Sequence, residues 1–175
     1  MIKMAIVKAN YIKHGTSERE KAKASIRYIE HRRGKDGAKI TRTLFGTDGL
    51  LGRWQAYRMV DTAEKGSVFF RFVISPDPIK EDTEKDLFLR EIIEKTMHTL
   101  EDRVQKSVQW VAAVHADHTP HRHVHVVAVV PGKLQVQDFQ ALRQTATEAA
   151  LFQRRERDQA REQKQRGREG AQWEI

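Results

Sequence analysis

Cysteine is absent from this chain, so disulfide bonds and thiolate metal ligands are both excluded. Long apolar runs are absent too, and none approaches the length of a membrane span. Lys3 and Lys8 near the N-terminus are not followed by the long apolar core of a signal peptide. We therefore expect a protein without a membrane span, located in the cytoplasm.

Acidic residues are outnumbered in the composition. The 24 Asp and Glu residues face 32 Lys and Arg, which leaves a formal net charge of +8 at pH 7. Such an excess favours an anionic partner, with nucleic acid as the first candidate. A basic protein without such a partner would carry the same charge, so composition alone leaves both possibilities open. The length of 175 residues suits one domain with a substantial core.

Apolar patterning along the chain predicts a mixture of helices and strands. Strands are expected at residues 4–10, 39–45 and 67–75, followed later by a hairpin at 108–130. Apolar residues at helical spacing predict helices at about 18–32, 53–64, 81–104 and 137–153. This order indicates an α+β fold, a largely antiparallel β-sheet with helices packed on one face.

The character of the chain changes at residue 154. The preceding part, residues 1–153, is expected to form the folded domain. From Arg154 onward there are almost no apolar residues, which is typical of a solvated helix or a disordered segment. We therefore expect a charged C-terminal tail at 154–175, which either contacts nucleic acid as a basic arm or has no binding role.

Histidine is concentrated in one stretch, because five of the eight histidines fall within residues 115–125. His123 and His125 alternate with valines, so on a strand both imidazoles point to one face. His115 ends the preceding apolar run, and pairing of residue 115 with 123 or 125 in the hairpin adds its imidazole to that face. Buried imidazoles cost free energy unless they have partners. The stretch therefore predicts a transition-metal site with open coordination positions.

A histidine-rich metal site in a basic protein indicates phosphoester chemistry, because a metal ion holds a phosphate and neutralises charge developing on its oxygens. Without cysteine, the nucleophile is water, a serine or threonine hydroxyl, or a tyrosine. The chain has only three tyrosines, Tyr11, Tyr28 and Tyr57, and all precede the histidines. Tyr28 lies off the apolar stripe of the first predicted helix, so it can face a site. Tyr57 is expected to pack in the core.

Two segments resemble the motifs of a known family. The pattern His115-X-Asp117-X5-His123-X-His125 resembles the histidine motif of conjugative and mobilisation relaxases, which belong to the HUH endonuclease superfamily. The upstream segment Arg27-Tyr28-Ile29-Glu30 is similar to the tyrosine motif of these enzymes. In HUH replication initiators the tyrosine follows the histidines, so the order here resembles relaxases instead. The resemblance covers roughly residues 5–152 and implies an HUH relaxase-like fold with a ferredoxin- or RRM-like core.

The resemblance also implies an activity and roles for the motif residues. The protein would nick single-stranded DNA at the transfer origin of a mobile element, beside a hairpin. Tyr28 would attack a phosphate, forming a 5′-phosphotyrosine and releasing a 3′-OH. The metal ligands would be His115, His123 and His125, and Asp117 would orient one imidazole. The metal would be Mn²⁺ or Mg²⁺, with Mn²⁺ the better match because Mg²⁺ prefers oxygen ligands.

Other parts of this interpretation are less specific. The general base for Tyr28 is left open between Asp77 and Glu30. Basic residues after the first predicted helix are candidates for tracking phosphates; they are Arg32, Arg33, Lys35, Lys39 and Arg42. Relaxases often carry further C-terminal domains, whereas this chain has only a charged tail. We therefore expect a small relaxase or an excised relaxase domain that works with accessory mobilisation proteins.

Three alternative functions stay open from the sequence. One is an HUH replication initiator, which the position of the tyrosines disfavours. Another is a metal-dependent hydrolase that uses water, for which Tyr28→Phe would leave cleavage intact. The third is a non-catalytic nucleic-acid-binding α+β domain, whose DNA binding would be insensitive to chelators.

Overall fold

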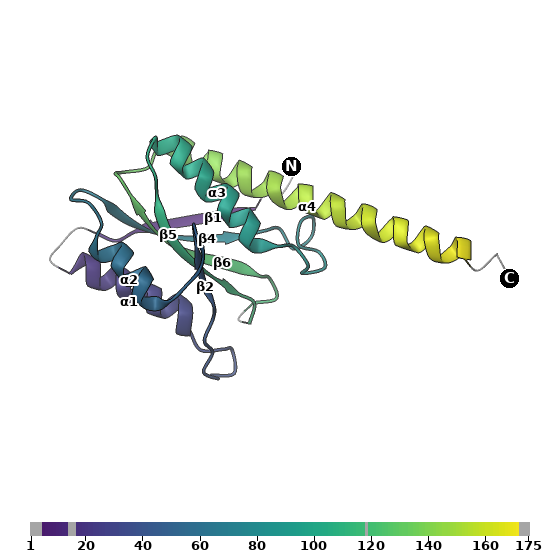
Figure 1. Cartoon of the computed structure of the whole chain (residues 1–175), viewed down its shortest axis with the longest axis horizontal. Coiled ribbons are helices and arrows are strands. Elements are labelled where there is room, and N and C mark those ends of the chain that lie inside the picture. Colours follow the sequence, from purple (N-terminus) through teal and green to yellow (C-terminus); the bar gives the residue numbers. More distant parts are fainter. Residues whose placement is uncertain (1–4, 14–16, 118, 172–175) are drawn as a thin grey trace.

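One antiparallel sheet organises the computed structural model, which describes residues 5–13, 17–117 and 119–171 (Figure 1). Its six strands are β1 (Ile6–Tyr11), β2 (Leu44–Gly46), β3 (Gly49–Leu51), β4 (Val68–Ser75), β5 (Gln109–His115) and β6 (His123–Val130). Their order across the sheet is β1-β4-β6-β5-β2-β3, and every neighbouring pair is antiparallel. The predicted α+β class with a largely antiparallel sheet is therefore confirmed.

Helices cover both faces of this sheet rather than one. They are α1 (Glu18–His31), α2 (Arg53–Asp61), α3 (Leu89–Val104) and α4 (Val136–Ala171). Helices α3 and α4 pack on one face, and α1 and α2 pack on the other (Figure 1). The expectation of helices on a single face is wrong because the central strands are apolar on both sides. In β4, Phe72 belongs to the core beneath α3 and α4, whereas Phe69 belongs to the core beneath α1 and α2.

The hairpin of β5 and β6 has the register that the histidine pattern requires. His115 lies opposite His123, and Ala113 lies opposite His125. Residues of the same face, Ala113 and Val127, are buried with α1 and α2. The predicted common face is therefore confirmed, and the three imidazoles project toward α1.

Two predicted elements are shorter in the structure. Residues 39–43 form no strand, because the N–H of Arg42 donates to the carbonyl of Glu30 at the end of α1. Helix α3 begins at Leu89 rather than at residue 81. Before it, Asp77 and Asp82 accept hydrogen bonds from nearby backbone N–H groups, which competes with helix formation. We call residues 76–88 the acidic loop.

Helix α4 continues without a break across the predicted boundary between residues 153 and 154. Its first half packs on the sheet and on α3, with Leu142, Ala146 and Ala150 buried. Beyond the arginines that contact the acidic loop, its C-terminal part extends away from the rest of the fold (Figure 1). Of the two predicted states of the tail, the described residues take the helical one, and Arg154 itself is buried. Within the described part of the chain, no helix combines the length and apolarity needed to cross a membrane.

Glu81 of the acidic loop gives the fold a pH dependence. Its side chain is fully buried, and burial raises its pKa from an ordinary 4.5 to about 7. The folded chain therefore favours the protonated form, and stability present below pH 4.5 is lost as the pH rises through 7, by roughly 3 kcal/mol. We expect Glu81→Gln to raise the melting temperature at pH 8 and to have little effect near pH 5.

Thermal denaturation of both proteins between pH 5 and pH 8 checks this expectation. Glu84→Gln is the matched control, because Glu84 is an exposed carboxylate of the same loop. A difference in melting temperature between wild type and Glu81→Gln that is constant across this range would contradict it.

Candidate metal centre and adjoining groove

The three predicted ligands converge at the end of the β5–β6 hairpin. One ring nitrogen from each of His115, His123 and His125 lies within 4.8 Å of the other two. The ring centroids are 4.4 Å apart for His115 and His125, 5.0 Å for His123 and His125, and 5.5 Å for His115 and His123. The side chain of His115 is fully buried and that of His123 nearly so. The sequence prediction of a three-histidine cluster is confirmed, while occupation by a metal stays a prediction.

Two histidines of this cluster, His115 and His125, have ring nitrogens in the state that a cation needs. His115 Nε2 donates to the carbonyl oxygen of Ile29 in α1 at 2.8 Å, which leaves Nδ1 as the acceptor. Within the described residues, His115 Nδ1 and His125 Nε2 are buried without a hydrogen-bond partner. Burial lowers the pKa of His115 to about 4 and that of His125 to about 3, so both are neutral at pH 7. Neutral imidazoles with unused lone pairs fit a divalent transition metal.

Tyr28 lies beside this cluster on α1. Its ring meets the ring of His125 edge-on, with centroids 6.1 Å apart, and its side chain is 49% exposed. The guanidinium of Arg32, one turn later, lies 5.5 Å from the centroid of the Tyr28 ring. The bond from His115 to Ile29 also attaches the helix next to Tyr28 to the cluster. The structure thus brings the predicted nucleophile and the predicted ligands together.

The remaining tyrosines have other surroundings. Tyr57 packs partly buried against the core beneath α1 and α2, as predicted, and its ring meets Trp54 edge-on. Tyr11 is 56% exposed at the end of β1 and contacts Phe70.

The carboxylate of Asp117 forms an ion pair with an arginine. Arg42 donates to its two carboxylate oxygens at 2.7 and 2.9 Å. The same guanidinium donates to the carbonyl of Arg32 at the end of α1, at 2.7 Å, and Arg42 is buried. Arg42 therefore joins α1 to the hairpin, which contradicts its predicted role in tracking phosphates. The orientation of an imidazole by Asp117 stays a prediction.

Neither of the two predicted general bases, Asp77 and Glu30, shares the groove that Tyr28 borders. Asp77 is buried in the acidic loop, where its Oδ1 accepts hydrogen bonds from the N–H groups of Ile79 and Lys80. Glu30 accepts a hydrogen bond from Nε of Arg53 at 2.6 Å. Neither carboxylate lines the groove that Tyr28 borders. Other donors hold both groups, so the structure gives no support to either as the base.

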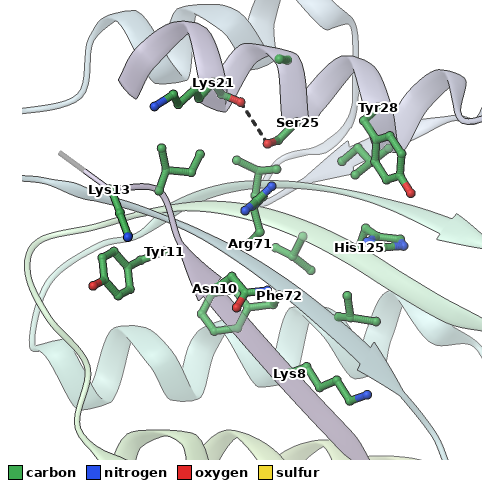
Figure 2. A pocket seen from close by; sticks show the side chains of 16 residues that line it. Lys8, Asn10, Tyr11, Lys13, Lys21, Ser25, Tyr28, Arg71, Phe72 and His125 are labelled. Carbon is green, nitrogen blue, oxygen red and sulfur yellow. Dashed lines mark hydrogen bonds between the residues drawn. The ribbon is translucent and has the colours of Figure 1, made fainter. Parts of the chain in front are cut away.

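A groove of about 850 Å³ leads away from Tyr28 and His125, between α1 and the strands β1 and β4 (Figure 2). Four cationic side chains line it: Lys8, Lys13, Lys21 and Arg71. No aspartate or glutamate is among its described lining residues, and none of the four cations forms an ion pair with a described residue. By contrast, Lys23, Lys95 and Lys106 elsewhere on the surface each pair with a carboxylate, as in Lys95 with Glu91 at 2.8 Å. The groove is therefore a surface that attracts anions.

Sequence reasoning missed this groove because its cations come from separate elements. Two local signals were nevertheless present. Arg71 is the only charged residue in strand β4, which is apolar apart from Arg71 and the terminal Ser75. In β1, Lys8 and Asn10 alternate with apolar residues, so both point to the face that carries Arg71.

Comparison with known proteins identified no relative, since no protein-family model, curated protein or solved structure matches this chain. The function is therefore argued from the residues of the site itself.

Proposed function

We propose that this protein is a metal-dependent DNA relaxase, which nicks single-stranded DNA at the transfer origin of a mobile element for conjugative mobilisation. The observation that carries the proposal is the position of Tyr28. It lies half-exposed beside three clustered imidazoles and at the head of a basic groove. A hairpin beside the nick and accessory mobilisation proteins are part of the proposal through the family resemblance.

The proposed reaction is a transesterification at one phosphate. The hydroxyl oxygen of Tyr28 attacks the phosphorus, the bond to the 3′ oxygen breaks, and the products are a 5′-phosphotyrosine and a 3′-OH. His115, His123 and His125 would hold a divalent cation, Mn²⁺ or Mg²⁺, which would supply Lewis-acid stabilisation of charge on the phosphate oxygens. Arg32, whose guanidinium lies against the Tyr28 ring, adds a fixed positive charge close to the attacking group.

The side chains that line the groove support the proposal of a single-stranded substrate. Binding of single strands combines cations that follow the phosphates with exposed aromatic rings on which bases stack. Lys13, Lys21 and Arg71 supply such cations. Tyr11 supplies a half-exposed ring in the same groove, at some distance from Tyr28 (Figure 2).

Removal of a groove cation is expected to weaken binding of single-stranded DNA in a salt-dependent way. For Lys21→Ala and for Arg71→Ala, we expect the slope of log affinity against log salt to fall by about 0.7, the value for one phosphate contact on a single strand. Fluorescence anisotropy with a labelled oligo-dT at several salt concentrations measures both affinity and slope.

Lys95→Ala is the control for these variants, because Lys95 lies on α3 and pairs with Glu91. If Lys21→Ala and Arg71→Ala bind oligo-dT with the same salt slope as wild type and this control, the groove is not the path of the strand.

The direct test of the proposed function uses labelled single-stranded oligonucleotides from the encoding element, incubated with Mn²⁺ or Mg²⁺ and separated on a denaturing gel. A metal-dependent covalent protein–DNA adduct is the expected result. Cleavage without an adduct would instead support a hydrolase that uses water. Binding that is insensitive to chelators, with no cleavage of origin-containing DNA, would support a non-catalytic binding domain.

A further inference from the structure

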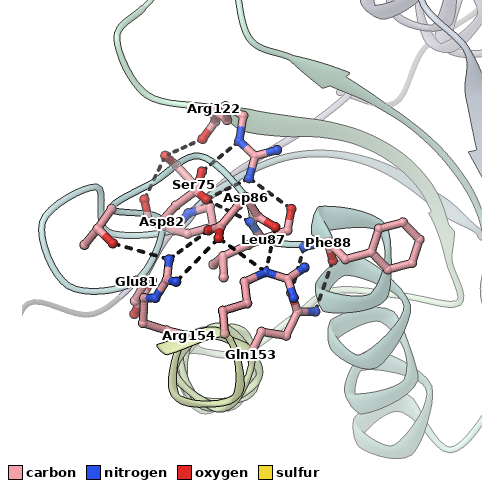
Figure 3. A network of polar contacts seen from close by, with 12 residues as sticks. Ser75, Glu81, Asp82, Asp86, Leu87, Phe88, Arg122, Gln153 and Arg154 are labelled. Carbon is pink, nitrogen blue, oxygen red and sulfur yellow. Dashed lines mark hydrogen bonds and ion pairs between the residues drawn. The ribbon is translucent and has the colours of Figure 1, made fainter. Parts of the chain in front are cut away.

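Arg122, the residue before His123, contacts the acidic loop (Figure 3). Its guanidinium donates to both carboxylate oxygens of Asp82, at 2.7 and 2.8 Å, and to the carbonyl of Leu87 at 2.9 Å. The hydroxyl of Ser75 donates to the carbonyl of Arg122 at 3.3 Å. Asp82 is buried, so this two-pronged pair is shielded from solvent. Both the side chain and the main chain of Arg122 are therefore held.

Helix α4 holds the same loop from the other side. Arg154 is buried and donates to Asp86 at 2.7 Å, and Arg157 donates to the carbonyl of Asp86 at 2.7 Å. The side-chain amide of Gln153 accepts from the N–H of Phe88 at 2.7 Å and donates to its carbonyl at 3.2 Å. The acidic loop contains no helix or strand of its own. These contacts hold it together with the buried side chains of Glu81 and Leu87.

A hydrogen bond within the loop joins its middle to its C-terminal end. Asp82 Oδ1, which accepts from Arg122, accepts a second hydrogen bond from the N–H of Leu87 at 3.2 Å. The series thus runs from Arg154 to Asp86, along the chain to Leu87, and by hydrogen bonds through Asp82 to Arg122. Breaking a buried ion pair leaves a charge without compensation, so the intact series resists local rearrangement.

We infer that α4 positions the metal ligand His123 through the acidic loop, which makes Arg122, Asp82 and Arg154 positioning residues of the metal centre. His123 is the first residue of β6, and its pairing with His115 settles only the face on which its ring lies. The direction from which the chain enters β6 is set by Arg122. Contacts one shell behind a ligand typically change metal affinity 10–100-fold. The inference rests on the proposed metal centre but does not depend on DNA cleavage.

Titration of the full chain with Co²⁺ tests this inference, because calorimetry gives the affinity and the visible spectrum reports the ligand geometry. We expect Arg154→Ala and Asp82→Asn to bind Co²⁺ about 10–100-fold more weakly than wild type, with an altered spectrum. Arg103→Ala is the matched control. Arg103 of α3 donates to Asp138 of α4 at 2.8 Å, so it also attaches α4, but it has no contact with the loop in this network. Its Co²⁺ affinity and spectrum are expected to stay as in wild type.

Melting temperatures measured on the same samples separate positioning from general loss of stability. Arg122→Lys provides a milder variant that keeps the charge and removes the two-pronged pair, and it is expected to weaken Co²⁺ binding even where Arg154→Ala does not fold. The double variant of Arg154→Ala and Asp82→Asn should bind Co²⁺ more tightly than the product of the single effects predicts, because both break one series.

The possible failures of this test are distinguishable. If wild type itself does not bind Co²⁺, the metal centre of the proposed function is wrong. If wild type binds but Arg154→Ala and Arg122→Lys bind equally well, only the positioning role is overturned. An equal loss of Co²⁺ affinity in Arg103→Ala would also overturn the positioning role. The loss would then result from any weakening of the contacts that hold α4 on the fold.

Discussion

Replacement of Tyr28 by phenylalanine is expected to abolish the covalent protein–DNA adduct and to reduce strand cleavage by at least about 10³-fold, because the phenyl ring carries no nucleophile. The variant keeps the aromatic ring at position 28, which contacts both the ring of His125 and the guanidinium of Arg32. Tyr28 is half-exposed, so the change in stability is expected to stay within about 0.5 kcal/mol. Metal affinity should therefore be retained while the chemistry is lost, and both are measured on the same preparation.

Tyr11→Phe is the matched control for this experiment. Tyr11 is also half-exposed and lines the same groove, but it lies away from the histidines (Figure 2). Its variant should still form the adduct on a denaturing gel. Cleavage that persists in Tyr28→Phe would assign the attack to water and replace the relaxase proposal with that of a metal-dependent hydrolase.

Replacement of His125 by alanine is expected to lower the affinity for Mn²⁺ by at least about 100-fold and to suppress cleavage in parallel, because one of three nitrogen ligands is lost. His125 is a sharper choice than His115, whose ring also bonds to the carbonyl of Ile29. Nε2 of His125 has no hydrogen-bond partner among the described residues. Removal of this side chain therefore takes no hydrogen bond at Nε2 from another protein group. Isothermal titration with Mn²⁺ measures the loss.

His98→Ala serves as the control for histidine removal in general. His98 is exposed on α3 and pairs with Glu101, on the face of the sheet opposite the cluster. Wild-type Mn²⁺ affinity in His125→Ala would show that the three imidazoles do not form the metal site.

The histidine cluster was predictable because its information is local. Alternation with valines sets the face of His123 and His125, and the short hairpin connection places His115 opposite. The partnership with Tyr28 depends on a contact between residues far apart in the sequence. The helical wheel showed only that Tyr28 can face a site, and the family resemblance linked it to the histidines. Its geometry, including the bond from His115 to α1, needed the structure.

The acidic loop shows why other parts were not predictable. Apolar spacing extends the helix back to residue 81, but side chains of Asp77 and Asp82 bind backbone N–H groups there. The partners that hold the loop, Arg122 and Arg154, are 40 and 68 residues from their aspartates. No periodic pattern records such long-range ion pairs. For the same reason, the buried pairing of Arg42 with Asp117 was mistaken for a free basic surface.

The position of β1 at the border of the sheet has a separate consequence. Strands at a sheet edge expose unpaired backbone groups, which invite edge-to-edge pairing with another molecule. At the opposite edge, β3 has only three residues and offers little to pair with. Strand β1 is longer, but Lys8 within it and Lys13 just after it carry charges that two copies would bring together. The cations that favour an anionic strand in the groove thus also oppose self-association of the protein.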